Sequence, residues 1–177
     1  MSRRLLSFMF IVGLLCLVGA VAMAKEITVA EEEARAVTGM EVEVSSLHHR
    51  LTIGPHIIDG DVGTRDQRWI SQAADTEPWA MFMLPEVVTV DAVVLYSGMD
   101  AHDADPYIAD TYVIEAMQGA DWVQVARVEG NLSYRCVTAF PAVTANAWRI
   151  RFIKANNWVD AVDYRARIFE VRLLQVK

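Results

Sequence analysis

Apolar and polar residues alternate in short runs from residue 41 to near the end of the chain. In the run from Trp148 to Phe152, for example, apolar residues alternate with Arg149 and Arg151. Such alternation places every second side chain on one face of a strand. The expected strands cover 41–44, 79–84, 87–96, 112–117, 122–128, 134–140, 147–153 and 166–174. Because no helical pattern alternates with them, they predict an all-β fold, an antiparallel jelly-roll β-sandwich of about eight strands.

The residues before this pattern are of two kinds. Residues 29–37 have a helical pattern, and the acidic residues at 31–33 suit the first turn of a helix. Residues 1–24 have the form of an export signal, with Arg3 and Arg4, an apolar run over 5–21 and the small residues Ala22 and Ala24 at its end. The alternative is a retained membrane anchor, since the apolar run is near the shortest length that spans a bilayer. We expect a signal peptide at 1–24, an N-terminal lead-in at 25–40 and one domain at 41–177, in a secreted, extracellular or periplasmic protein.

The net charge limits the classes of binding partner, and the cysteine content limits the possible disulfides. Without Arg3 and Arg4, the 16 Lys and Arg fall to 14 against 23 Asp and Glu, a formal charge of −9. This charge argues against nucleic acid and against anionic membrane surfaces. It is compatible with cations and with neutral ligands such as sugars. After cleavage Cys136 is the one remaining cysteine, so an intramolecular disulfide is excluded.

A tight acidic loop at 59–64 is the most informative stretch. Asp59, Asp61 and Thr64 place oxygen ligands two and three residues apart, and Gly60 and Gly63 allow sharp turns between them. Calcium takes six to eight hard oxygens, so a carboxylate from elsewhere in the chain would have to complete such a site. The alternative is that the two aspartates cap a turn.

Several short motifs follow this loop in a characteristic order. They are Trp69, the apolar strand 90–96, Tyr112 to Glu115, Gly119 to Trp122, Arg149 to Arg151, and 167–173. In this order they resemble the discoidin (coagulation factor 5/8 type C) family, and in particular its family 32 carbohydrate-binding modules. The resemblance covers about residues 41 to 174 and implies a galactose-binding-domain-like sandwich.

The resemblance also implies a structural calcium ion. Its side-chain ligands would be Asp59, Thr64 and Glu170, and its carbonyl ligands would come from His56, Asp61 and Phe169. Such an ion would join the acidic loop to the last strand.

The chain departs from the galactose-binding pattern at two positions. Ile70 stands where those relatives have a sugar-binding histidine, and Ser97-Gly98-Met99 stands where they have an arginine. About three extra residues, 66–68, also lengthen the segment before Trp69. The resemblance therefore implies the fold but not galactose as the ligand.

Two other loops carry candidate ligand-binding residues. Asp100, His102 and Asp103 could hydrogen-bond sugar hydroxyls or hold a second cation, although a plain solvated loop has the same composition. Trp158 could stack on a sugar ring, with Asn156, Asn157 and Asp160 as polar contacts, or it could simply close the end of the sandwich. Trp69 completes the candidate ligand residues.

We find no catalytic motif, and a glycosidase pair of Asp103 and Glu115 would need a cleft that such a sandwich hardly offers. The expectation is a non-catalytic domain that binds glycans, or alternatively a protein-interaction or adhesion domain of discoidin type whose partner is a cell-surface or extracellular protein. The strand tryptophans Trp79, Trp122 and Trp148 are expected in the core. Asn131 begins a glycosylation sequon.

Overall fold

A computed structural model describes residues 27–158 and 163–176; the predicted export signal lies outside the described residues. The elements are α1 (Val29–Arg35), β1 (Glu41–Val44), the 3-10 helix η1 (Gly54–Ile58), β2 (Trp69–Ile70), β3 (Trp79–Ser97), β4 (Thr111–Gln118), β5 (Asp121–Val128), β6 (Arg135–Lys154) and β7 (Arg167–Gln175). All strands that are hydrogen-bonded to each other within the described residues run antiparallel. Neither helix has the length and apolar character that a bilayer span requires, within these described residues.

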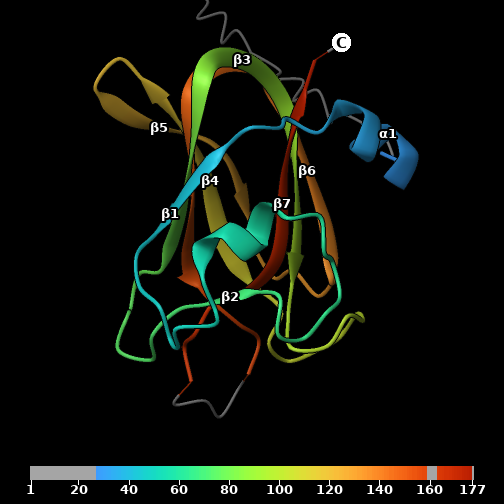
Figure 1. Cartoon of the computed structure of the whole chain (residues 1–177), viewed down its shortest axis with the longest axis vertical. Helices are drawn as coiled ribbons and strands as arrows, with labels where there is room; N and C mark the ends of the chain where they lie inside the picture. Colours follow the sequence, from blue (N-terminus) through green and yellow to red (C-terminus); the bar gives the residue numbers. More distant parts are fainter. Residues whose placement is uncertain (1–26, 159–162, 177) are drawn as a thin grey trace, which may run out of the picture.

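Two long bent strands connect the layers of the sandwich. The first half of β3 pairs with β1 and with 147–151 of β6, and its second half pairs with β7 and with 135–145 of β6. The ladder breaks its register between Met83 and Val88, and Pro85 lies in this break. Proline cannot donate a ladder hydrogen bond, so it suits the bend. Figure 1 shows β3 arching over one end of the molecule.

The predicted antiparallel sandwich is therefore confirmed, with a different division into strands. One layer contains β1, β4, β5 and one half each of β3 and β6; the other contains β2, β7 and the remaining halves. The expected strands 79–84 and 87–96 are one strand, as are 134–140 and 147–153. Alternation is interrupted at each bend, so the sequence pattern marks the faces of the flanking segments but not their connection. The two-residue strand β2 was not predicted.

The core lies between the two layers. Phe82, Leu95, Ile114 and Ile150 all face inward and are fully buried, as their alternation predicts. Trp148 is in this core, also as predicted. The same expectation is wrong for Trp79 and Trp122, which are only half-buried. Their strand positions point to the outer face, where the guanidinium of Arg149 lies 4.5 Å from the Trp122 ring centroid.

Helix α1 covers the outer face of the second layer. The predicted helix over 29–37 is confirmed as Val29–Arg35, with Thr28 capping its first turn. Glu32 is fully buried, and its carboxylate accepts hydrogen bonds from Arg135, Arg172 and the hydroxyl of Tyr96. The lead-in thus packs on the sandwich beside the apolar cluster that contains Tyr96.

Candidate functional site

Three connecting loops meet at one end of the sandwich: 98–110, 129–134 and the described parts of the last loop, 155–158 and 163–166. Asn131 joins them, because its backbone N–H donates to the carbonyl of Asp110 and its carbonyl accepts from the side chain of Asn157. The Asn131 side-chain nitrogen donates to the carbonyls of Ala109 and Ser133. The sequon asparagine is therefore buried and hydrogen-bonded, so the folded chain does not present it for glycosylation.

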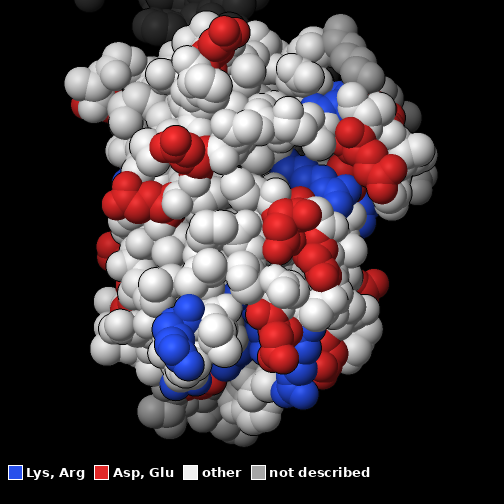
Figure 2. Space-filling view, in the orientation of Figure 1, with Lys and Arg blue, Asp and Glu red and all other residues white. Residues whose placement is uncertain are grey.

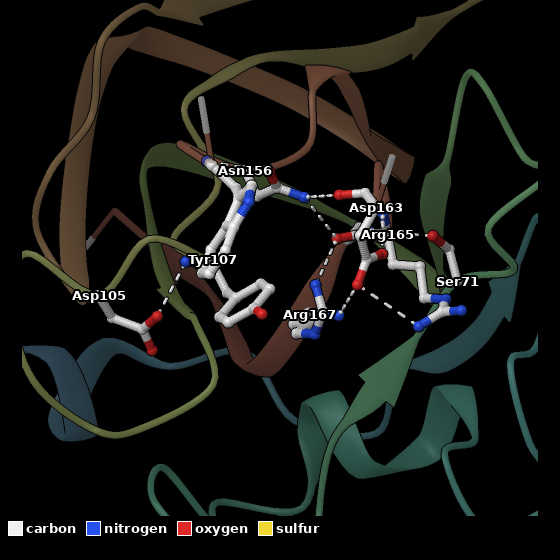
Figure 3. Close-up of polar contacts among 9 residues, drawn as sticks. Ser71, Asp105, Tyr107, Asn156, Asp163, Arg165 and Arg167 are labelled. Atoms are coloured by element: carbon white, nitrogen blue, oxygen red, sulfur yellow. Dashed lines mark hydrogen bonds and ion pairs between the residues drawn. The ribbon is translucent and has the colours of Figure 1, made fainter. Parts of the chain in front are cut away.

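An aromatic stack at this end carries Trp158. The Trp158 and Tyr107 rings are stacked, with centroids 5.2 Å apart and an interplanar angle of 24°. The Arg167 guanidinium lies 4.2 Å from the Tyr107 centroid, and Figure 3 shows these two side chains next to each other. Trp158 keeps 43% of its surface exposed. The sequence pointed to Trp158 but missed Tyr107 and Arg167, because residues on separate loops leave no periodic pattern.

An ion-pair network holds Arg167 in the stack. Its guanidinium lies 2.5 Å from the carboxylate of Asp163, which also pairs with Arg165 at 3.4 Å. Burial by itself would raise the pKa of Asp163, but the Arg167 hydrogen bond and charge outweigh it and lower the pKa. Figure 3 shows Asp163 between the two arginines.

The side chains of Asn156 and Asn157, which were predicted to contact a ligand, donate hydrogen bonds to carbonyls of the loops. The Asn156 side chain is almost fully buried and donates to the carbonyl of Asp163, while its oxygen accepts from the N–H of Trp158. Asn157 donates to the carbonyl of Asn131. The buried Asn156 amide is therefore committed to the loop backbone, whereas ligand contact by the half-buried Asn157 stays a prediction. Asp160 lies outside the described residues.

The acidic loop at 100–105 is organised by an aspartate that the sequence did not single out. Asp105 is buried, and its carboxylate accepts from the N–H groups of Met99, Asp100 and Tyr107. Asp100 and His102 are exposed, and so is Asp103, which accepts from the N–H of Tyr134. Among the described residues no group of three His, Cys, Asp or Glu side chains is placed to hold a metal ion. The second-cation alternative for this loop thus finds no geometric support.

This loop does lie beside Trp158. The N–H of Asn157 donates to the carbonyl of Pro106, next to Tyr107. The exposed carboxylates and Trp158 therefore belong to the same end of the sandwich.

The acidic loop at 59–64 lies against the last strand. Asp59 accepts from the N–H of Asp61, and Asp61 accepts from the N–H groups of Gly63 and Thr64, so both aspartates do cap turns. The N–H of Gly60 donates to the carboxylate of Glu170 at 3.2 Å. The register between β3 and β7 is irregular next to Glu170, and such a bulge redirects side chains.

The electrostatics around Glu170 are those of an incompletely compensated carboxylate. Burial, with a smaller contribution from Asp59, raises the pKa of Glu170 to about 7 against the opposing effects of Gly60 and Arg172. The hydroxyl of Tyr134 and Nδ1 of His56 are buried without hydrogen-bond partners among the described residues. A cavity of about 320 Å³ borders Asp59 and Glu170. Asp59 and Glu170 both line this cavity, so their hard carboxylate oxygens suit a cation with its waters, whereas the other expected ligands do not line it.

Comparison with known proteins gives a fold. The sequence matches no family model and no curated protein. The structure is similar to the family 32 carbohydrate-binding module of Streptococcus pneumoniae EndoD (TM-score 0.67, 17% identity, 80% of this chain and 99% of that one). This chain has the fold of a family 32 carbohydrate-binding module.

Other modules with this fold bind different sugars. The family 32 module of Clostridium perfringens NanJ was solved with galactose (TM-score 0.60, 16% identity, 76% of this chain and 92% of that one). A chitosan-binding module from a Paenibacillus chitosanase/glucanase also matches (TM-score 0.58, 19% identity, 77% of this chain and 94% of that one).

Within this family 32 fold, the two departures from the galactose pattern lie on either side of Arg167. Ile70 is opposite Arg167 in the β2–β7 pair, and the N–H of Gly98 donates to the carbonyl of Arg167. Trp69, expected to contact a ligand, is fully buried, and its indole N–H donates to the carbonyl of Ser46. That expectation is therefore corrected, because Trp69 packs into the core, where its ring centroid lies 6.0 Å from that of Phe152.

Proposed function

We propose that this chain is an exported, non-catalytic carbohydrate-binding domain that binds a glycan at the end of the sandwich that carries Trp158. The observation that carries the proposal is the half-exposed Trp158 ring, held on Tyr107 at the loop end of a family 32 fold.

The geometry of Trp158 suits a sugar ring. A pyranose offers apolar C–H faces to an aromatic ring and hydroxyls to polar groups around it. Because Tyr107, itself packed against Arg167, already holds Trp158 from one side, little side-chain freedom is lost when a ligand stacks on the remaining surface. The exposed carboxylates of Asp100 and Asp103 lie at the same end and can accept hydrogen bonds from hydroxyls.

A structural calcium ion is the second part of the proposal. Asp59, Thr64 and Glu170 would hold it through side chains, and His56, Asp61 and Phe169 through carbonyls. When bound, calcium would neutralise Glu170 and Asp59 together and join the acidic loop to β7. The raised pKa of Glu170 and the unpaired hydroxyl of Tyr134 support a cation at this place.

Export rests on the signal-like residues 1–24, and the absence of catalysis rests on the missing motifs.

The test is glycan binding by wild-type protein and two tryptophan variants. Trp158→Ala should weaken the affinity for any glycan that binds at least about tenfold, which corresponds to ~1.4 kcal/mol. Trp122→Ala removes a half-buried tryptophan from the outer sheet face and should leave binding unchanged. A glycan array with no bound glycan, or full binding by Trp158→Ala, would contradict the proposal.

A protein-interaction function would use the same surface. Leu132 and Tyr164 are both exposed on the loops around Trp158, and exposed apolar side chains are common in interfaces. Cell-surface binding that persists after the glycans are enzymatically removed would favour this alternative over the sugar.

A further inference from the structure

Arg68 is a buried arginine without a carboxylate partner among the described residues. Only 5% of its surface is exposed. Its Nη1 donates to the carbonyl of Met99 at 2.7 Å, and its guanidinium lies 5.4 Å from the ring centroid of Phe169. Its Nε is buried and has no hydrogen-bond partner.

The other buried arginines differ from Arg68 in this respect. Arg35 pairs with Asp91 and Arg167 with Asp163, and the half-buried Arg172 pairs with Glu32. An unpaired buried charge is costly, and proteins normally pair it or neutralise it. An arginine cannot lose its proton at ordinary pH, so the compensating charge at Arg68 has to be supplied.

The surroundings of Arg68 increase this demand. Burial lowers the pKa of Arg68 most, and the positive charges of Arg167 and Arg65 lower it further. Asp100 and Asp66 act in the opposite direction, but neither is within ion-pair distance in the described structure. Figure 2 shows basic side chains gathered toward the lower end and beside α1, although acidic ones are spread over this face.

We propose that Arg68 is a binding site for an anionic group, the carboxylate or sulfate of an acidic glycan. A guanidinium binds such groups through two parallel N–H···O hydrogen bonds. Nη1 donates to Met99, whereas the buried Nε has no acceptor and would be free for this geometry once the group reaches it. The proposal rests on the proposed carbohydrate function and adds the class of sugar to it.

Two loops flank the Arg68–Met99 hydrogen bond, residues 61–67 and 99–104, and they approach each other at Gly63 and Ala101, both exposed. Among the described residues no hydrogen bond joins these two loops directly, apart from the one that Arg68 itself makes to Met99. Separating them therefore breaks little.

A chain of contacts links Arg68 to the Trp158 stack, so one ligand can bind to both. It lies against Phe169, which is two residues after Arg167, and Arg167 contacts Tyr107 in that stack. The negative net charge of the chain does not exclude an acidic glycan, because exposed charges are screened beyond about 10 Å at 0.1 M salt.

The first experiment measures thermal unfolding in sodium sulfate and in sodium chloride of equal ionic strength. At a sulfate concentration about tenfold above Kd, wild-type protein should gain about 3 to 6 °C relative to chloride. Arg68→Met keeps the side-chain length without the charge and should lose this gain. Arg127→Met, at an exposed arginine of β5 that pairs with Glu129, is the matched control and should behave as wild type. An equal sulfate effect in wild type and Arg68→Met would overturn the proposal.

The second experiment compares an oligosaccharide ending in glucuronate with its methyl ester by calorimetry. Wild type should bind the acid at least about tenfold more tightly, Arg68→Met should lose this preference, and Trp158→Ala should weaken both ligands. Equal affinity for acid and ester overturns the acidic-glycan inference, and a sulfate effect alone means that Arg68 binds free anions only. If neither oligosaccharide binds, the carbohydrate function fails for this probe, while the sulfate measurement still decides the role of Arg68. Should Arg68→Met not fold, the acid and ester comparison on wild type remains decisive.

Discussion

The calcium-free protein should lose stability as the pH rises from 5 to 8, because of Glu170. Burial raises the pKa of this carboxyl from 4.5 to about 7. The folded protein therefore holds the Glu170 proton more tightly than the unfolded chain does. Its contribution to stability is complete below about pH 4.5 and is lost as the pH rises through about 7.

The size of this effect follows from the two pKa values. A tenfold change in a protonation equilibrium corresponds to about 1.4 kcal/mol, so the difference between 4.5 and about 7 amounts to roughly 3 kcal/mol. For a domain of this size, 3 kcal/mol corresponds to about 6 to 12 °C in melting temperature. Calcium bound beside Glu170 would favour the ionised carboxylate and should remove most of the loss.

The assay is urea unfolding at pH 5, 6, 7 and 8, in a chelator and in excess calcium. Glu170→Gln is neutral at every pH, so the difference between it and wild type isolates this carboxyl from His48, whose pKa is lowered chiefly by burial. In the chelator, the free energy of unfolding of wild type should fall by about 3 kcal/mol relative to that of Glu170→Gln between pH 5 and 8. A parallel course for the two proteins would refute the assignment for Glu170. A wild-type curve that calcium does not change would refute the calcium site.

Two further changes test the elements that support the site. Glu32→Gln should lower the free energy of unfolding in urea by about 2–3 kcal/mol, because its partners Arg135 and Arg172 lose a buried counter-charge but keep some exposure. The control is Glu33→Gln, a change at the exposed neighbouring residue, which should have almost no effect. Equal effects of the two changes would contradict the role of Glu32. Asp105→Ala leaves three backbone N–H groups without their acceptor, so it should lower the free energy of unfolding by about 2–3 kcal/mol. It should also shift the tryptophan fluorescence spectrum. An unchanged spectrum would argue that Asp105 does not organise the loop around Trp158.

The expectations that depend on local spacing agree with the structure most closely. The strand faces, the helix at Val29–Arg35 and the burial of Trp148 follow from periodicity and from the acidic residues of the first helical turn. The same reasoning misplaced Trp79 and Trp122, because alternation gives two faces but does not say which one meets the other layer. It also divided β3 and β6, since a bend within a strand has no periodic signature.

Residues far apart in sequence were predicted only where the family resemblance supplied the pairing. The acidic loop and the last strand meet where Gly60 donates to Glu170, 110 residues away, and the resemblance had placed these two segments next to each other. The stack at Trp158 continues through Tyr107 and Arg167 to Asp163. Neither a local pattern nor the family resemblance predicted these contacts. Asn156 and Asn157 have the composition of a sugar site, yet backbone carbonyls take up their amides.

The sequence by itself determined the all-β sandwich, its alternating faces and the acidic loop at 59–64, because each depends on neighbours within a few residues. The tertiary structure decided which side chains share one end of the sandwich and which buried charges are compensated. The pairing of Arg167 with Asp163, and the lack of such a partner for Arg68, are properties of distance and burial. A linear pattern does not contain them, because burial is set by segments that meet only after the chain has folded.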